Sequence, residues 1–274
     1  MLSRSKYILQ PAKRFYSSVP LSFNKYSVKP SSEPPVLICH GLFGSKQNWS
    51  SLAKAMSNRL SRTVYTIDLR NHGDSPHTNI HTYETMSNDL VEFMAEHDIQ
   101  KPVLLGHSMG GKTVMTTALQ HPALVSKLIV IDMPPVAMRL SADFARYVDA
   151  MRAIDQANPK RQSEADKILA QYESDIGVRM FLLTNLKRDA ATGEFRFRVP
   201  YETLGRSLQT IGGFIEKTAP FEQPTLFIAG GSSPYYKPFQ NQKKEIDALF
   251  PNSDLQVVEG AGHWVHAEKP DIKP

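Results

Sequence analysis

Ser108 has the sequence surroundings of a catalytic nucleophile. It is the central residue of a Gly-x-Ser-x-Gly pattern at residues 106–110, between an apolar segment at 103–105 and a predicted helix that starts at residue 111. At a tight strand-to-helix turn, the serine hydroxyl projects above the sheet and the first N–H groups of the helix face the developing oxyanion. The pattern alone could be a glycine-rich turn with a capping serine, but its context favours an acyl-enzyme chemistry on Ser108.

The base that accepts the serine proton is predicted to be His263. With a nucleophile at such a turn, the acid and then the histidine follow along the chain, and only His263 and His266 lie late enough. His263 follows an apolar segment through the small residues 260–262, whereas His266 lies three residues further on, in a segment that leaves the site. The earlier histidines are interpreted as loop residues: His40, His72 and His107.

The acid that orients the histidine is predicted to be Asp132. A common position for this acid is the loop after the next-to-last strand, but residues 230–235 contain no carboxylate, and the next acids along the chain lie in a predicted helix. Asp132 ends the apolar segment 128–131. Because sites form at the carboxyl ends of parallel strands, Asp132 can reach the histidine from the strand next to that of the nucleophile. Its alternative role is to cap the turn that follows.

An acyl-transfer site also needs two donors for the oxyanion, and both are predicted to be backbone N–H groups. One is the N–H of Met109, directly after the nucleophile. The other is the N–H of Leu42, in the loop 40–44 that follows the first predicted strand.

Two further polar features have a functional and a structural interpretation. The segment 68–75 could form a metal site or a second acid site, but we favour a loop that satisfies its own backbone groups. Lys112 could contact an anionic substrate group, although a solvated or ion-paired lysine is the more common case. We find no spacing typical of a zinc site or of a phosphate-binding loop, and we expect no metal and no cofactor.

The elements that must position these residues alternate between strands and helices. Apolar, β-branched segments predict buried strands, and apolar residues at helical spacing predict the helices between them. The strands are expected at 36–39, 63–68, 103–105, 128–131, 225–229 and 255–258, and the helices at 48–60, 83–97, 111–121 and 239–250. This alternation predicts an α/β fold with a mostly parallel sheet and helices on both faces.

The alternation is interrupted between about residues 134 and 217, where a helical lid insertion is expected. Its helices are predicted at 144–157, 163–174, 177–186 and 201–214, with one hairpin strand at 195–199. Apolar lid residues could line an acyl pocket, although each could equally pack in a core: Met138, Phe144, Tyr147, Met151, Met180 and Phe181.

Charge is unevenly distributed along the 274 residues. Six of the 32 basic residues and none of the 27 acidic residues lie in residues 1–32, so the rest of the chain has 26 basic and 27 acidic residues. The net charge of +5 therefore belongs to the leader, and a nucleic-acid-binding surface is not expected. No apolar run approaches the roughly 18 residues that span a bilayer. Cys39 is the only cysteine, which excludes an intrachain disulfide.

Residues 1–32 are predicted to be a mitochondrial transit peptide and linker, followed by a hydrolase domain at 33–274. The segment is free of acids and contains arginine and serine, and its apolar stretch at residues 7–9 is too short for a secretory signal. A disordered basic N-terminus without a targeting role is the alternative. The expected location is the mitochondrial matrix.

Five segments together resemble the mitochondrial α/β-hydrolase-domain subgroup, which includes small bacterial esterases and the fungal ethanol acetyltransferases. The matching segments are 40–46, 70–76, 106–112, 230–235 and 260–267, and the similarity extends over about residues 35–270. The resemblance implies an α/β-hydrolase fold and an acid on the strand after the nucleophile, which supports Asp132. It also implies a C-terminal helix after the histidine loop, where this chain has only eleven residues, including Pro270 and Pro274.

Three hypotheses for function follow. The first is a serine hydrolase that cleaves a small-molecule ester or thioester by a Ser108, Asp132 and His263 triad. The second is an alcohol acetyltransferase, in which ethanol captures the acyl group of acetyl-CoA, here a substrate, to make ethyl acetate. The third is a non-catalytic protein that binds a partner on the same fold. The acyl acceptor depends on which molecules reach the site beneath the lid.

Overall fold

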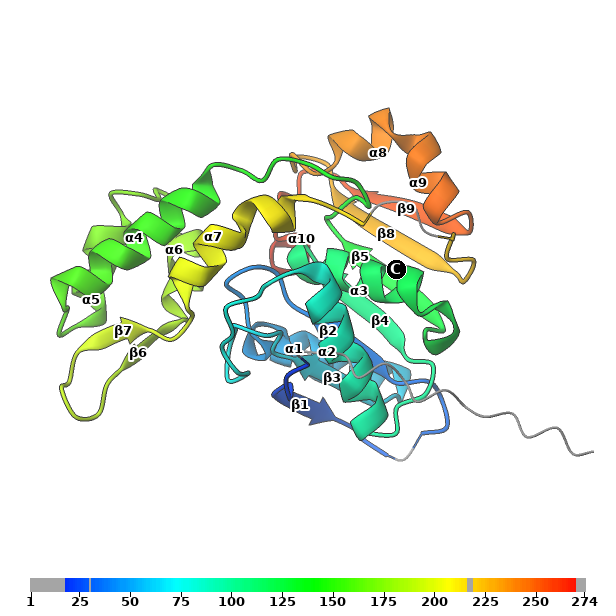
Figure 1. Cartoon of the computed structure of the whole chain (residues 1–274), viewed down its shortest axis with the longest axis horizontal. Helices are drawn as coiled ribbons and strands as arrows, with labels where there is room; N and C mark the ends of the chain where they lie inside the picture. The colour runs from blue at the N-terminus through cyan, green and yellow to red at the C-terminus, as the bar shows by residue number, and fades with distance from the viewer. Residues whose placement is uncertain (1–17, 30, 216–218, 270–274) are drawn as a thin grey trace, which may run out of the picture.

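The computed structural model describes residues 18–29, 31–215 and 219–269, and its centre is a seven-stranded sheet (Figure 1). The strand order is β1-β3-β2-β4-β5-β8-β9, with β1 antiparallel to β3 and all other neighbours parallel. The strands are β1 (Phe23–Tyr26), β2 (Val36–Cys39), β3 (Val64–Ile67), β4 (Val103–His107), β5 (Lys127–Ile131), β8 (Thr225–Gly230) and β9 (Ser253–Val258).

Helices cover both faces of the sheet, as the alternating pattern predicted. Leu37, Leu104 and Phe227 point into a large core beneath α2 (Tyr83–Glu96), α3 (Met109–Gln120), α8 (Lys237–Asn241) and α9 (Lys243–Leu249). Ile38 and Leu105, which alternate with them along the strands, face a smaller core beneath α1 (Ser50–Leu60) and α10 (Val265–Glu268). The predicted fold class is confirmed: strands buried on both faces are nearly continuous apolar runs because neither face meets water.

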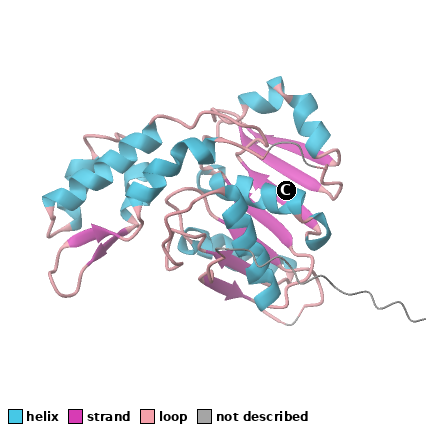
Figure 2. Cartoon of the chain, in the orientation of Figure 1, coloured by secondary structure: helices cyan, strands magenta, loops and turns pink. Residues whose placement is uncertain are grey.

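An insertion of mostly helical structure connects β5 to β8 (Figure 2). It contains α4 (Asp143–Ala157), α5 (Gln162–Leu169), α6 (Ile176–Leu183) and α7 (Tyr201–Gly212), with the antiparallel pair β6 (Leu186–Arg188) and β7 (Phe195–Phe197). Figure 1 shows these elements extending to one side of the sheet. Buried residues of α4, α6 and α7 belong to the same core as the sheet, which keeps the insertion continuous with the domain beneath it.

Four elements differ from the sequence-based expectations. Strand β1 was not predicted, because its residues Phe23–Tyr26 do not form a fully apolar run and none of them is fully buried at this edge of the sheet. The helix expected at 239–250 is interrupted at Gln242 and forms α8 and α9. Helix α5 ends at Leu169, and Leu186 begins β6 rather than ending α6. Most of the predicted transit peptide, residues 1–17, lies outside the described residues.

No helix among the described residues is long and apolar enough to cross a bilayer.

The sheet brings the carboxyl ends of its parallel strands together at one edge. Strands β2, β4, β5, β8 and β9 run parallel, so the loops that follow them meet at one edge.

Candidate active site

The nucleophile candidate Ser108 occupies a strained turn between β4 and α3. Its backbone has φ 54° and ψ −118°, a conformation that L-residues rarely adopt. The flanking glycines permit the close packing that the turn requires: a Cβ on Gly106 would lie 2.3 Å from the carbonyl oxygen of Gly110, and a Cβ on Gly110 would lie 2.3 Å from that of Cys39. The turn therefore places the serine Oγ at the carboxyl edge of the sheet.

The side chains of Ser108, His263 and Asp132 form one continuous hydrogen-bonded chain. His263 Nε2 is 2.9 Å from Ser108 Oγ, and His263 Nδ1 is 2.6 Å from Asp132 Oδ2. Asp132 is fully buried and Ser108 is 5% exposed. With Nδ1–H donating to the carboxylate, Nε2 is free to accept the serine proton. The structure thus brings together the three residues that the sequence singled out, although His263 lies 131 residues from Asp132 and 155 residues from Ser108 in the chain.

Asp132 is held by donors that the sequence did not reveal. Its Oδ1 accepts a hydrogen bond from the backbone N–H of Gly230 at 2.9 Å, and its Oδ2 accepts a second one from Ser233 Oγ at 2.5 Å. The loop 230–235, which lacks a carboxylate of its own, instead supplies partners to the carboxylate of β5. Its small polar residues were the signal for this role. These two hydrogen bonds fix the direction in which the carboxylate faces His263.

The loop that carries His263 is fixed on both sides. His107 Nε2–H donates to the backbone carbonyl of His263 at 2.9 Å. The carboxylate of Glu268 accepts from the N–H of Gly262 at 2.7 Å and from that of Trp264 at 3.3 Å. Glu268 belongs to α10, a helix of four residues that directly follows the histidine loop, and residues 270–274 lie outside the described residues. His107 and Glu268 are positioning residues that sequence reasoning missed.

The loop that follows β2 supplies the second predicted oxyanion donor. Leu42 and Met109 lie beside Ser108 and line one small pocket with it. Within the described residues, no acceptor is recorded for the N–H of Leu42 or that of Met109. The next residue, Phe43, has φ 61°, and its N–H donates to His72 Nε2 at 3.1 Å. The loop conformation is thus held from outside the site, and both N–H groups stay free for a ligand.

Buried imidazoles support this loop in their neutral form. His40 Nε2 accepts from the N–H of Leu69 at 3.1 Å, while its Nδ1–H donates to the carbonyl of Gly41 at 2.8 Å. Burial lowers the pKa of His40 and of His72, the latter well below its usual range. Protonation would turn each accepting nitrogen into a donor that faces another donor, so the loop geometry requires neutral rings.

Acidification is expected to reduce stability through such histidines. Burial lowers the pKa of His81 to about 3 and that of His266 to about 4, whereas both titrate near about 6.5 when unfolded. Below about pH 6.5 the unfolded chain therefore binds more protons than the folded protein. The free energy of unfolding is at its full value above this pH and decreases as the pH falls. Each histidine contributes a decrease of up to about 1.4 kcal/mol per pH unit. Urea unfolding at pH 7.5, 6 and 5 measures this slope. His81→Gln should make it shallower; an identical slope in the variant would contradict the assignment.

The two ambiguous polar features have structural roles. Asp68 is fully buried and accepts from the N–H and the Nζ of Lys46, at 2.6 and 2.5 Å, and from the N–H of Asp74 at 2.8 Å. Lys112 is neither solvated nor ion-paired, so that expectation is wrong: it is fully buried, and its Nζ donates to the carbonyls of Gly212 and Gly213. No cluster of potential metal ligands exists among the described residues.

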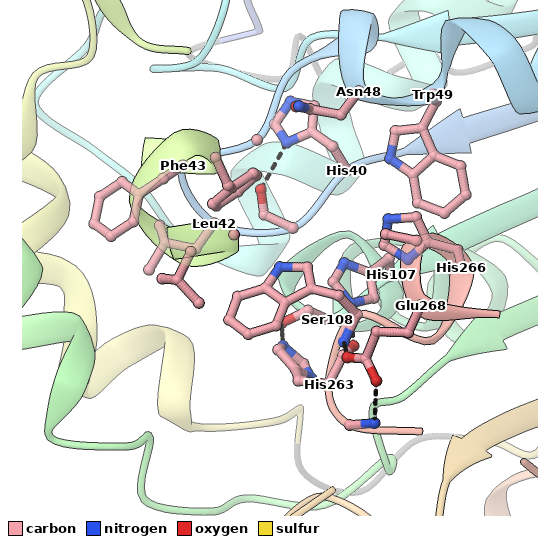
Figure 3. A pocket seen from close by; sticks show the side chains of 18 of the residues that line it. His40, Leu42, Phe43, Asn48, Trp49, His107, Ser108, His263, His266 and Glu268 are labelled. Carbon is pink, nitrogen blue, oxygen red and sulfur yellow. Dashed lines mark hydrogen bonds between the residues drawn. The ribbon is translucent and has the colours of Figure 1, made fainter. Parts of the chain in front are cut away.

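A cavity of about 800 Å³ opens at Ser108 (Figure 3). It extends from the histidine loop to α1 and α6, and its walls include Trp49, Phe181 and Trp264. Of the six lid residues considered from sequence, Phe144, Tyr147 and Phe181 line it. Met151 is fully buried in the core, Met138 packs against that core, and Met180 is 43% exposed, so the pocket expectation was wrong for these three methionines. His266 does not leave the site: its ring stacks on Trp49 at 4.2 Å and lines the cavity.

Comparison with known proteins identifies the family to which this chain belongs. Residues 34–270 match the model of a family described as alpha/beta hydrolase fold. The chain belongs to the alpha/beta hydrolase family. It is 43% identical over 256 residues to "sn-1-specific diacylglycerol lipase ABHD11" from Mus musculus, covering 92% of this chain and 82% of that one. It is 38% identical over 264 residues to "Probable alcohol acetyltransferase" from Saccharomyces cerevisiae, covering 86% and 74% of the two chains.

A solved structure gives the same result. The "Marine microorganism esterase" superposes with a TM-score of 0.84 at 35% identity, covering 92% of this chain and 96% of the other. The predicted subgroup of α/β hydrolases, with esterases and a probable fungal alcohol acetyltransferase among its members, is confirmed, whereas its mitochondrial aspect stays a prediction. This alpha/beta hydrolase is an enzyme of the esterase and lipase type.

Proposed function

We propose that this hydrolase cleaves carboxyl esters or thioesters through an acyl-enzyme on Ser108. The observation that carries the proposal is the hydrogen-bonded chain from Ser108 through His263 to Asp132. Ser108 Oγ attacks the acyl carbonyl while His263 Nε2 takes its proton and then returns it to the leaving group. Asp132 keeps the imidazole in the required tautomer and stabilises the imidazolium.

The oxyanion of each tetrahedral intermediate is stabilised by the N–H groups of Leu42 and Met109. Water then attacks the acyl-enzyme, with His263 again as the base, and the free acid leaves. The proposal requires no cofactor, because every proton and electron pair in these steps is supplied by the triad, the substrate and water.

A second candidate is an alcohol acetyltransferase, favoured by the similarity to the Saccharomyces cerevisiae protein of that name. Its acyl-enzyme and triad are the same, with acetyl-CoA as the acyl donor. The two candidates differ only in the molecule that resolves the intermediate: water in one case, an alcohol such as ethanol in the other.

One experiment separates these candidates. The purified protein is treated with a fluorophosphonate probe, and peptide mass spectrometry locates the adduct, which is expected on Ser108. The unlabelled protein is then incubated with acetyl-CoA with and without ethanol. Free acetate alone supports the hydrolase, and ethyl acetate that increases with ethanol supports the acetyltransferase. Absence of both labelling and turnover would instead favour the third hypothesis, a non-catalytic binding protein.

We also propose that the protein works in the mitochondrial matrix. The support is the acid-free, basic composition of residues 1–32. A fluorescent reporter fused behind these residues should accumulate in mitochondria, and a uniformly cytosolic signal would refute the proposal.

A further inference from the structure

Two pockets of very different size meet at Ser108. The large cavity, about 800 Å³, has His263 in its wall. The other pocket measures only about 10 Å³, and the proposed oxyanion residues Leu42 and Met109 line it with Ser108. This volume is enough for about one water molecule, or a group of similar size such as a methyl. Apolar and aromatic side chains complete the lining of this small pocket: Tyr83, Met133, Leu140, Phe144 and Ile211, of which Phe144 also lines the large cavity.

The position of His263 decides which part of a substrate enters each pocket. In the tetrahedral intermediate, His263 Nε2–H must reach the leaving oxygen or sulfur to protonate it. The leaving group therefore lies on the side of His263, which lines the large cavity but not the small pocket. With the oxyanion between Leu42 and Met109, the remaining substituent, the acyl chain, points into the small pocket.

We propose that the natural substrates are esters or thioesters of short acyl groups, of about two or three carbons, with a bulky alcohol or thiol, and that Met133, Leu140 and Ile211 set the limit on acyl length. This inference rests on the proposed function, because it uses the roles of Ser108 and His263 given above. It deepens that function by naming the substrate class and the residues that select it.

Hydrogen bonds from α2 and α3 fix the part of the small-pocket wall that contains Ile211. Tyr83 OH donates to the carbonyl of Ile211 at 2.6 Å. Lys112 Nζ donates to the next two carbonyls, those of Gly212 at 2.9 Å and Gly213 at 2.8 Å. Three successive carbonyls at the end of α7 are thus held by α2 and α3, and moving the wall outward would leave buried polar groups unpaired. Burial also lowers the pKa of Lys112 to about 7, consistent with an enclosed, anchored amine. A longer acyl chain therefore cannot easily create its own space.

The large cavity, unlike the small pocket, has room for a large substituent. Its walls are formed by separate elements, α1, α6 and the segment around α10, and the aromatic rings of Trp49, Phe181 and Trp264 lie along it. These rings provide broad apolar surfaces for a large leaving group. In Figure 3, Ser108 and His263 lie in the lower half of the view, and the lining residues Asn48 and Trp49 lie above them.

The test uses two ester series with the purified protein. In the first, the alcohol is constant and the acyl chain lengthens: 1-naphthyl acetate, butyrate and octanoate. In the second, the acid is constant and the alcohol lengthens: ethyl, butyl and octyl acetate. We expect kcat/KM to fall by about 100-fold or more from acetate to octanoate, and to stay level or rise along the acetates. A wild-type enzyme that prefers octanoate would overturn the inference while leaving the acyl-enzyme mechanism intact.

Variants of Leu140 localise the effect. Leu140→Ala should raise the octanoate-to-acetate ratio of kcat/KM by about tenfold, and Leu140→Phe should lower the butyrate-to-acetate ratio. Val178→Ala, on the wall of the large cavity only, is the matched control and should leave both ratios unchanged. Fluorophosphonate labelling of Ser108 reports that each variant is folded. Unchanged ratios in labelled Leu140 variants would refute the acyl-length assignment, whereas no labelling and no turnover in the wild type would refute the proposed function as well.

Discussion

Ser108→Ala is expected to reduce kcat for ester cleavage by about 10⁶-fold, the scale seen when a serine nucleophile of this kind is removed. Ser108 supplies the only hydroxyl placed 2.9 Å from the imidazole Nε2 of His263 in the described hydrogen-bond network. Without it no acyl-enzyme forms, and the remaining acceleration comes from oxyanion stabilisation and substrate binding. The measurement is kcat on 1-naphthyl acetate, together with mass spectrometry of the protein after mixing, in which the acetyl adduct should be absent.

The matched control is Ser126→Ala. Ser126 Oγ donates to the carbonyl of Pro102, at the opposite end of the sheet from the site. This variant also loses one serine hydroxyl and should retain kcat within about a factor of two, because surface-region changes away from special features have small effects. Retention of more than about 1% of wild-type kcat by Ser108→Ala would contradict covalent catalysis at this residue.

Asp132→Asn has the second largest expected effect, a loss of about 10⁴-fold in kcat with a much smaller change in KM. The carboxylate accepts hydrogen bonds from His263 Nδ1, Ser233 Oγ and the N–H of Gly230. An amide can accept on its oxygen only, so its NH₂ group must face one of these donors or impose the wrong imidazole tautomer. The rate of fluorophosphonate labelling at Ser108 should fall in parallel with kcat, since both depend on deprotonation of the serine.

Ser233→Ala is the matched control for this prediction. It removes one of the three bonds to Asp132 but leaves an acceptor for His263 Nδ1. Its effect on kcat should therefore be far smaller than that of Asp132→Asn. Equal losses in the two variants would show that Asp132 acts through loop stability and not through the tautomer of His263.

Local sequence patterns were sufficient to predict the architecture of this chain. A buried strand is a short apolar run, and a helix repeats its apolar residues every three to four positions, so both can be seen within a few residues. The turn at Ser108 is equally local: a strand, two small residues around the serine and a helix. Local patterns do not predict features that depend on how the elements pack together. Strand β1 lacks a fully apolar run because it lies at the sheet edge, and Lys112 can be buried because its Nζ finds two carbonyl acceptors at the end of α7.

Only the tertiary structure decided which distant groups meet. The donors of Asp132 lie about 100 residues along the chain, the carbonyl that His107 holds belongs to His263, and the partners of Lys112 lie at the end of α7. No periodicity encodes such distances, because they depend on how helices and strands pack. The same reason applies to the space around the nucleophile. The sequence by itself determined the fold class and the candidate residues Ser108, Asp132 and His263. The sizes of the two pockets at Ser108, one small and one large, were decided only by the packing of α7, α4 and the loop after β5.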